Sequence, residues 1–145
     1  MFKHILLAAD GSDSAYAALQ VAVEMQKIFA AELWILSVFR HHSLREASMS
    51  MVRPVEPDNM DEMMKQYASE VAETCKRYAL DNNCTHVRAF VKSGHPARTI
   101  VRFAEERGAD LIILGNHGLG NTEAFIMGSV SHKVTGMAKC PVMVV

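Results

Sequence analysis

Short, mainly apolar runs alternate along the chain with longer segments in which apolar residues recur every three or four positions. The short runs are rich in Ile, Leu and Val, which is typical of strands buried on both faces of a parallel sheet. We therefore predict five strands, at Ile5–Ala9, Leu33–Val38, Val87–Val91, Leu111–Leu114 and Val142–Val145. The run Leu111–Leu114 is entirely apolar, which favours a central place in the sheet.

The longer segments predict helices, because such a recurrence places apolar side chains on one helix face. We expect four of them: after Ser12 and Asp13, from near Asp61 to Leu80, from Gly94-His95-Pro96 to Gly108, and from about Gly128 to Met137. Ser12 and Asp13 are interpreted as capping residues. Pro96 and Gly108 suit the first turn and the C-terminal stop of a helix.

The second predicted helix is rich in methionine, which we interpret as flexible filler of the core rather than as a cofactor site. Its expected apolar face consists of Met64, Tyr67, Val71, Cys75 and Tyr78. The segment before it, from Phe39 to about Asn59, has no clear period and contains two prolines. It predicts a long loop, and loops of that length are uncommon unless they have a function.

This order of elements predicts one domain over residues 1–145, with an α/β fold: a doubly wound, five-stranded parallel sheet with helices on both faces, Rossmann-like in kind. In such sheets, ligands bind beyond the carboxyl ends of the strands, where the strand order reverses. The loops after the first and the fourth predicted strand are therefore the candidate binding loops.

Charge and cysteine content narrow the function. The formal net charge is −1, from 15 Lys and Arg against 16 Asp and Glu, without a basic cluster. We therefore expect neither a nucleic-acid partner nor a membrane surface. Three cysteines without a Cys-x-x-Cys pair, and seven histidines without metal-ligand spacing, indicate neither a disulfide framework nor a metal site. The N-terminal apolar run is too short for a signal peptide, so we expect a cytoplasmic protein.

Glycines are concentrated after the fourth predicted strand, at Gly115, Gly118 and Gly120, and Gly128-Ser129 opens the last helix. Glycine lets backbone amides approach phosphate oxygens, and a helix start adds unpaired N–H groups. The spacing therefore indicates a phosphate-binding segment, although each glycine alone could serve only a turn. The segment has neither the P-loop ending nor the dinucleotide fingerprint after the first strand.

Two further residues are candidates for ligand contacts. Asp10 ends the first predicted strand, where its carboxylate could accept hydrogen bonds from a base or a ribose, or could only support the turn with Gly11. His117 lies among the glycines and could donate to a phosphate oxygen or remain solvated. No catalytic arrangement is evident: there is no nucleophile elbow and no acidic pair at strand ends for a catalytic Mg²⁺. We therefore assign no catalytic residue.

Five segments together resemble the universal stress protein family across the whole chain: residues 5–12 (ILLAADGS), 94–97 (GHPA), 108–115 (GADLIILG), 128–131 (GSVS) and 140–145 (CPVMVV). Members that bind ATP carry Gly, two residues, Gly, nine residues, Gly and then Ser or Thr. Gly115, Gly118, Gly128 and Ser129 match that spacing. The chain is thus similar to the ATP-binding subgroup, whose fold is of the adenine nucleotide alpha hydrolase-like kind.

The resemblance implies a nucleotide site and a homodimer. The implied site residues are Ala9, Asp10, Val38, Gly115, Asn116, His117, Gly118, Gly128, Ser129 and Val130. Among them the glycines with Ser129 and Val130 would line the phosphates and ribose, Asp10 would meet the adenosine, and Val38 the adenine. The dimer would pair the last strands, Val142–Val145, at a sheet edge. Ala8 stands where many members have Pro, and Asn116-His117 where Ser with a basic residue is frequent.

We expect a regulatory protein of the stress response that binds ATP, with or without Mg²⁺, and acts as a nucleotide-dependent homodimer. Two alternatives remain. One is a weak ATPase or phosphotransferase that uses His117 or Asp13 as a base. The other is an interaction module with no nucleotide, which contacts partners through the loop from Phe39 to Asn59.

Overall fold

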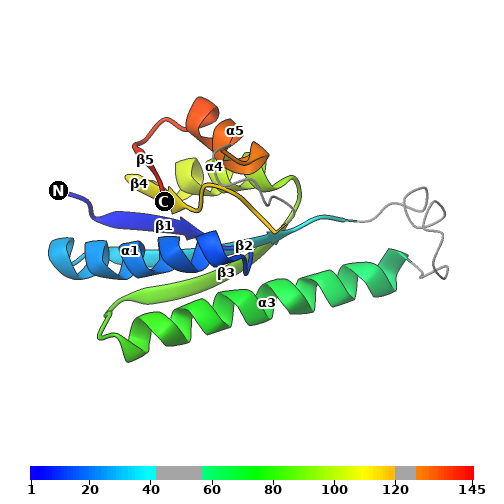
Figure 1. The fold of residues 1–145 in the computed structure, drawn as a ribbon, viewed down its shortest axis with the longest axis horizontal. Coiled ribbons are helices and arrows are strands. Elements are labelled where there is room, and N and C mark those ends of the chain that lie inside the picture. Colours follow the sequence, from blue (N-terminus) through cyan, green and yellow to red (C-terminus); the bar gives the residue numbers. More distant parts are fainter. Residues whose placement is uncertain (42–56, 120–126) are drawn as a thin grey trace.

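The computed structural model describes residues 1–41, 57–119 and 127–145. Within them, five parallel strands form one sheet of order β3-β2-β1-β4-β5 (Figure 1). The strands are β1 (His4–Ala8), β2 (Glu32–Phe39), β3 (Val87–Ser93), β4 (Leu111–Leu114) and β5 (Val142–Val144). The predicted doubly wound parallel sheet is confirmed, with the fully buried β4 in its interior and the last strand at an edge.

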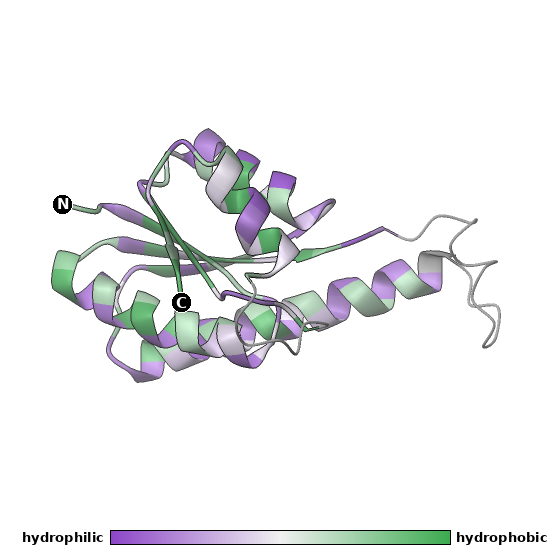
Figure 2. Cartoon of the chain, turned by 45° about the horizontal axis from the view of Figure 1, so that its top comes forward, coloured by the Kyte–Doolittle hydropathy of each residue, from purple (hydrophilic) through white to green (hydrophobic). Residues whose placement is uncertain are grey.

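Helices cover both faces of the sheet (Figure 1). The helices α1 (Asp13–Phe29) and α3 (Pro57–Asp81) pack on one face, and α4 (Pro96–Arg107) and α5 (Ser129–Met137) pack on the other. Side chains alternate between the two faces of a strand. Ile5 and Leu7 of β1 therefore belong to the core under α1 and α3, and Leu6 belongs to the core under α4 and α5. In Figure 2 the helices carry both hydrophilic and hydrophobic residues, whereas the central strands are mostly hydrophobic.

The local signals at the helix ends act as predicted, except that Asp13, interpreted as a capping residue, is the first residue of α1. Ser12 is the N-cap of α1, and its side chain accepts a hydrogen bond from the Ala15 N–H at 3.2 Å. Pro96 opens α4, and Gly108 ends it in the left-handed conformation, with φ at 72°. A residue without Cβ adopts this conformation at little cost, which explains the glycine at this stop.

The helix α3 corrects two predictions. It begins at Pro57, earlier than Asp61, and Phe39 still belongs to β2; residues 42–56 of the predicted loop lie outside the described residues. A helix of 25 residues is about 37 Å long, while a seven-residue strand is only about 23 Å. The N-terminal part of α3 therefore outruns the sheet. Met63 and Met64 are exposed there, so their interpretation as core filler was wrong.

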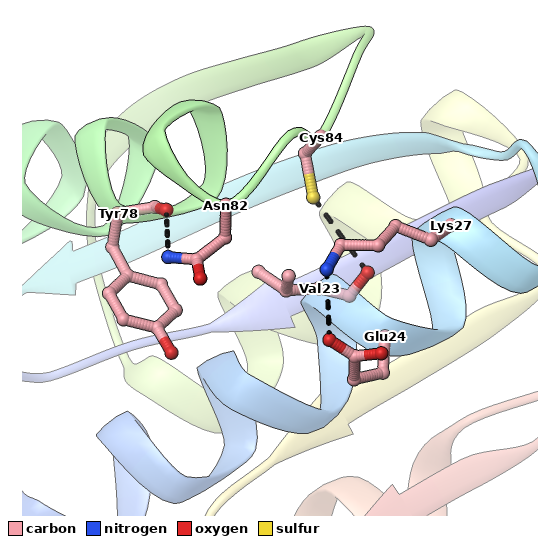
Figure 3. A network of polar contacts seen from close by, with 6 residues as sticks. All are labelled: Val23, Glu24, Lys27, Tyr78, Asn82 and Cys84. Atoms are coloured by element: carbon pink, nitrogen blue, oxygen red, sulfur yellow. Dashed lines mark hydrogen bonds and ion pairs between the residues drawn. The ribbon is translucent and has the colours of Figure 1, made fainter.

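A separate set of polar contacts lies where α3 leads into β3 (Figure 3). The Asn82 side chain donates to the Tyr78 carbonyl at 2.8 Å, and the Cys84 thiol donates to the Val23 carbonyl at 3.8 Å. The first contact closes the C-terminal end of α3, and the second joins the segment after α3 to α1. The three cysteines are free thiols, and burial raises the pKa of Cys75 to about 11. That thiol is a core residue rather than a reactive group.

The strand order reverses between β1 and β4. These two strands are neighbours, but the chain leaves β1 toward β2 and leaves β4 toward β5. A crevice therefore opens beyond their carboxyl ends, as the sequence predicted. It is bounded by the loop after Ala8 and the loop after Leu114.

Candidate functional site

A cavity of about 460 Å³ lies at this reversal point, between the two binding loops, the end of β2 and the first turns of α1, α4 and α5. Its size is that of a typical small-molecule site. Nine of the ten predicted site residues line it: Ala9, Asp10, Val38, Gly115, His117, Gly118, Gly128, Ser129 and Val130. The fold thus brings together residues that are more than a hundred positions apart in the sequence.

Asn116, the tenth predicted residue, does not line the cavity. Its backbone instead connects three parts of the molecule. Its N–H donates to the Val145 carbonyl at 2.8 Å, and its carbonyl accepts from the Gly128 N–H and from the Ser131 hydroxyl. The geometry gives the Asn116 backbone a role in holding the loop, while its side-chain Oδ1 is buried with no hydrogen-bond partner in the described part of the chain.

The Asp10 carboxylate supports the turn with one oxygen and leaves the other facing the cavity. Its Oδ1 accepts from the Ser12 N–H at 2.9 Å, which supports the turn. Its Oδ2 faces the glycine loop, because a Cβ atom added to Gly118 would lie 3.0 Å from it. The Tyr67 hydroxyl of α3 also donates to the Asp10 carbonyl at 3.3 Å. One carboxylate oxygen is therefore used locally, and the other is directed toward the cavity.

The glycines of the loop serve different purposes. A Cβ atom at Gly115 would lie 2.7 and 2.8 Å from the backbone C and O of Ser14, so this glycine lets β4 approach α1. A Cβ atom at Gly128 would lie 2.9 Å from the His117 Cα, so this one lets the loop approach α5. A Cβ atom added to Gly118 would have only Asp10 Oδ2 within 4 Å among the described residues. Gly118 lines the cavity.

The start of α5 supplies hydrogen-bond donors to the cavity. Gly128 is its N-cap and has no side chain, so no side-chain hydrogen bond caps this end. The first backbone N–H groups of a helix have no partner within it, and the helix dipole is positive there. Because Ser129 and Val130 of this first turn line the cavity, the turn is suited to an anion.

Apolar side chains form the rest of the wall. Leu36 and Val38 come from β2, and Pro96 and Ile100 come from α4. Leu36, Pro96 and Ile100 were not predicted as site residues, because in the sequence they look like an ordinary strand position, a helix start and a helix core position. This wall is suited to contact an apolar part of a ligand.

His117 has a buried atom with no hydrogen-bond partner in the described part of the chain, its ring Nδ1. Buried polar atoms are nearly always hydrogen-bonded in folded proteins. The His117 carbonyl, by contrast, accepts from the Ser14 hydroxyl. Because His117 also lines the cavity, its ring is a candidate donor or acceptor for whatever the cavity holds.

The groups that line the cavity are suited to binding a ligand. The cavity presents backbone N–H groups, hydroxyls, one carboxylate and an apolar wall. Across residues 1–41, 57–119 and 127–145, no group of three or more His, Cys, Asp or Glu side chains is arranged to hold a metal ion. In the same ranges, no helix is both long and apolar enough to cross a membrane.

Comparison with known proteins identifies the family. The model of the Universal stress protein family matches residues 1–145. The Universal stress protein YxiE of Bacillus subtilis (strain 168) is 34% identical over 148 residues, which cover 100% of this chain and 99% of that protein. The predicted resemblance is thereby confirmed.

Solved structures of similar fold agree. The universal stress protein UspA from Lactobacillus plantarum has a TM-score of 0.85 at 23% identity, covering 99% of this chain and 97% of that one. A universal stress protein in complex with cAMP has a TM-score of 0.72 at 23% identity, covering 99% and 96%. The universal stress protein from Archaeoglobus fulgidus in complex with dAMP has a TM-score of 0.69 at 18% identity, covering 99% of this chain and 97% of that one. From its sequence, its relatives and its fold, the chain belongs to the universal stress protein family.

Proposed function

We propose that this protein binds an adenine nucleotide in the cavity between β1 and β4, with ATP as the expected ligand, and acts as a cytoplasmic regulatory protein. One observation carries the proposal: the cavity brings together the uncapped start of α5, the open glycine Gly118, the Asp10 carboxylate and an apolar wall. Donors for phosphates, an acceptor for a ribose and a surface for a base occur together.

Two similar structures support the ligand class, since they were solved in complex with cAMP and with dAMP. Both ligands contain adenine and one phosphate. The step to ATP rests on the glycine spacing of the sequence. Gly118, Gly128 and the N–H groups of Ser129 and Val130 would contact the phosphates, Asp10 the ribose, and Val38 the adenine. Mg²⁺ would enter with ATP, held by the phosphate oxygens.

The substitution Gly118→Val tests the site directly. The valine side chain would occupy the space beside Asp10 Oδ2 and block the place proposed for the phosphates. We therefore expect the affinity for ATP to fall at least about a hundredfold. The backbone of Gly118 is not in the left-handed region, so the fold should be kept. The matched control is Gly136→Ala on α5, where an added Cβ meets no described atom within 4 Å. Equal ATP affinity of Gly118→Val and wild type by calorimetry would refute the site.

The edge strand β5 supports a homodimer as part of the same proposal. The Val145 N–H donates to Leu114 and the Val145 carbonyl accepts from Asn116, so alternation directs the backbone groups of Val142 and Val144 away from β4. An edge of valines without charged residues is suited to pairing. Val144→Pro removes one outward N–H, and we expect sedimentation to detect monomer. A dimer of unchanged strength would exclude this edge as the interface.

Slow ATP hydrolysis is the second candidate, and the unpartnered His117 Nδ1 favours it. Asp13, the other base considered, is exposed and does not line the cavity. ADP release by wild type and His117→Ala distinguishes the two functions. Equal rates would exclude a catalytic role for His117 and leave binding as the function.

A further inference from the structure

Two buried serines hold the backbone of the glycine loop. The Ser14 hydroxyl, from the first turn of α1, donates to the His117 carbonyl. The Ser131 hydroxyl, from the first turn of α5, donates to the Asn116 carbonyl at 2.9 Å and also lies 3.0 Å from the Gly128 carbonyl. Their exposed fractions are only 8% and 2%. Consecutive peptide groups of the loop are thus fixed from two different helices.

Fixing a carbonyl also fixes the N–H of the same peptide group. The peptide bond is planar, and in its trans form the carbonyl and the N–H point in opposite directions. No peptide bond among the described residues is cis. Because the His117 carbonyl points to Ser14, the Gly118 N–H points away from α1. The Ser14 hydroxyl therefore sets the direction of the Gly118 donor.

The Gly118 nitrogen also lies near the start of α5. The Gly118 nitrogen lies 3.6 Å from the position that a Cβ atom would take on Gly128, the N-cap of this helix. Gly118 and the first turn of α5 also line the same cavity. The Gly118 N–H and the open N–H groups of Ser129 and Val130 therefore belong to one cluster of donors, as expected of an anion site.

Ser14 is itself held in place. It follows the N-cap Ser12 of α1, and its backbone packs against Gly115, which has no side chain to keep β4 away. A strand and a helix thus fix the hydroxyl before any ligand arrives. Donors aligned in advance lose less free energy on binding than donors that must be ordered.

We propose that Ser14 is a positioning residue for the phosphate side of the nucleotide site, and that Ser131 supports it from α5. This inference rests on the proposed nucleotide binding. Ser14 acts through the peptide between His117 and Gly118, so its effect is confined to the phosphates. The apolar wall of Leu36, Val38 and Ile100 lies on other elements and is independent of it.

The test compares Ser14→Ala with wild type for ATP and for adenosine by calorimetry. We expect about a tenfold loss of ATP affinity, which is the size of one hydrogen bond, and less than about a twofold change for adenosine. The matched control is Ser37→Ala, another buried serine, which does not line the cavity. It should change neither affinity.

A second measurement keeps the inference testable if Ser14→Ala is unstable. In wild type, ATP should shift the amide resonance of Gly118 more than adenosine does, and Ser131→Ala should reduce that difference. Equal losses for ATP and adenosine in Ser14→Ala, or no loss, would overturn the positioning role. Wild-type protein that binds neither ligand would overturn the proposed function instead, so the two failures are distinct.

Discussion

The two sides of the cavity are built in different ways. The side assigned to the phosphates consists of backbone: Gly118, the N-cap Gly128, and the first turn of α5. The side assigned to the adenosine consists of side chains, with Val38 and Ile100 as the wall. A donor made of backbone depends on how closely the chain segments approach, whereas a wall made of side chains depends on their size and charge.

This difference teaches where each side is vulnerable. On the backbone side an added Cβ atom meets other backbone atoms, as at Gly115 and Gly128, and these cannot move aside like the end of a flexible side chain. On the side-chain side a substitution removes one contact and leaves the others in place. We therefore expect large effects on the first side, structural ones at Gly115 and Gly128, and graded effects on affinity on the second.

The largest effect is expected for Gly115→Ala. Its Cβ atom would lie 2.7 Å from the Ser14 backbone, so β4 and α1 would have to move apart. Such overpacking costs about 3 kcal/mol of the free energy of unfolding. Urea denaturation measures it, with Gly136→Ala as the control that should be neutral or stabilising by up to about 1 kcal/mol. Identical midpoints for Gly115→Ala and wild type would contradict the close approach.

An intermediate effect is expected for Asp10→Ala, which removes an acceptor of the adenosine side. Hydrogen bonds to charged groups contribute about 1.5–3 kcal/mol, so affinity for ATP and adenosine should fall at least about tenfold. Asp10→Asn removes the charge but keeps an oxygen that accepts from the Ser12 N–H. This variant therefore distinguishes the effect of the charge from that of a disturbed turn. The assignment fails if both variants bind adenosine as wild type does in calorimetry.

The smallest effect is expected for Val38→Ala on the apolar wall. Loss of two methyl groups of a half-buried valine costs about 1 kcal/mol, or about fivefold in affinity for ATP and adenosine. Inorganic triphosphate, which has no base, should bind equally well to Val38→Ala and to wild type. A loss of triphosphate binding would show that the two sides are not independent.

Much of this site could be predicted from local signals. Branched apolar runs specified the strands, Ser12 and Gly108 specified helix ends, and the glycine spacing marked the phosphate side. The reversal of strand order then placed Asp10 beside the glycine loop. These signals succeed because strand burial, capping and glycine conformations are properties of short segments.

What only the tertiary structure decided are the contacts between distant segments. Ser14 looks like any polar residue of a first helical turn, yet it lies against a loop more than a hundred positions away. Met64 has the helical spacing of core residues, but it is exposed, like its neighbour Met63, because α3 outruns the sheet. Asn116 was expected among the nucleotide contacts; it does not line the cavity, and its backbone joins Val145 to α5. Periodicity gives the face of a helix or strand; which atoms meet across that face is set by how the elements pack.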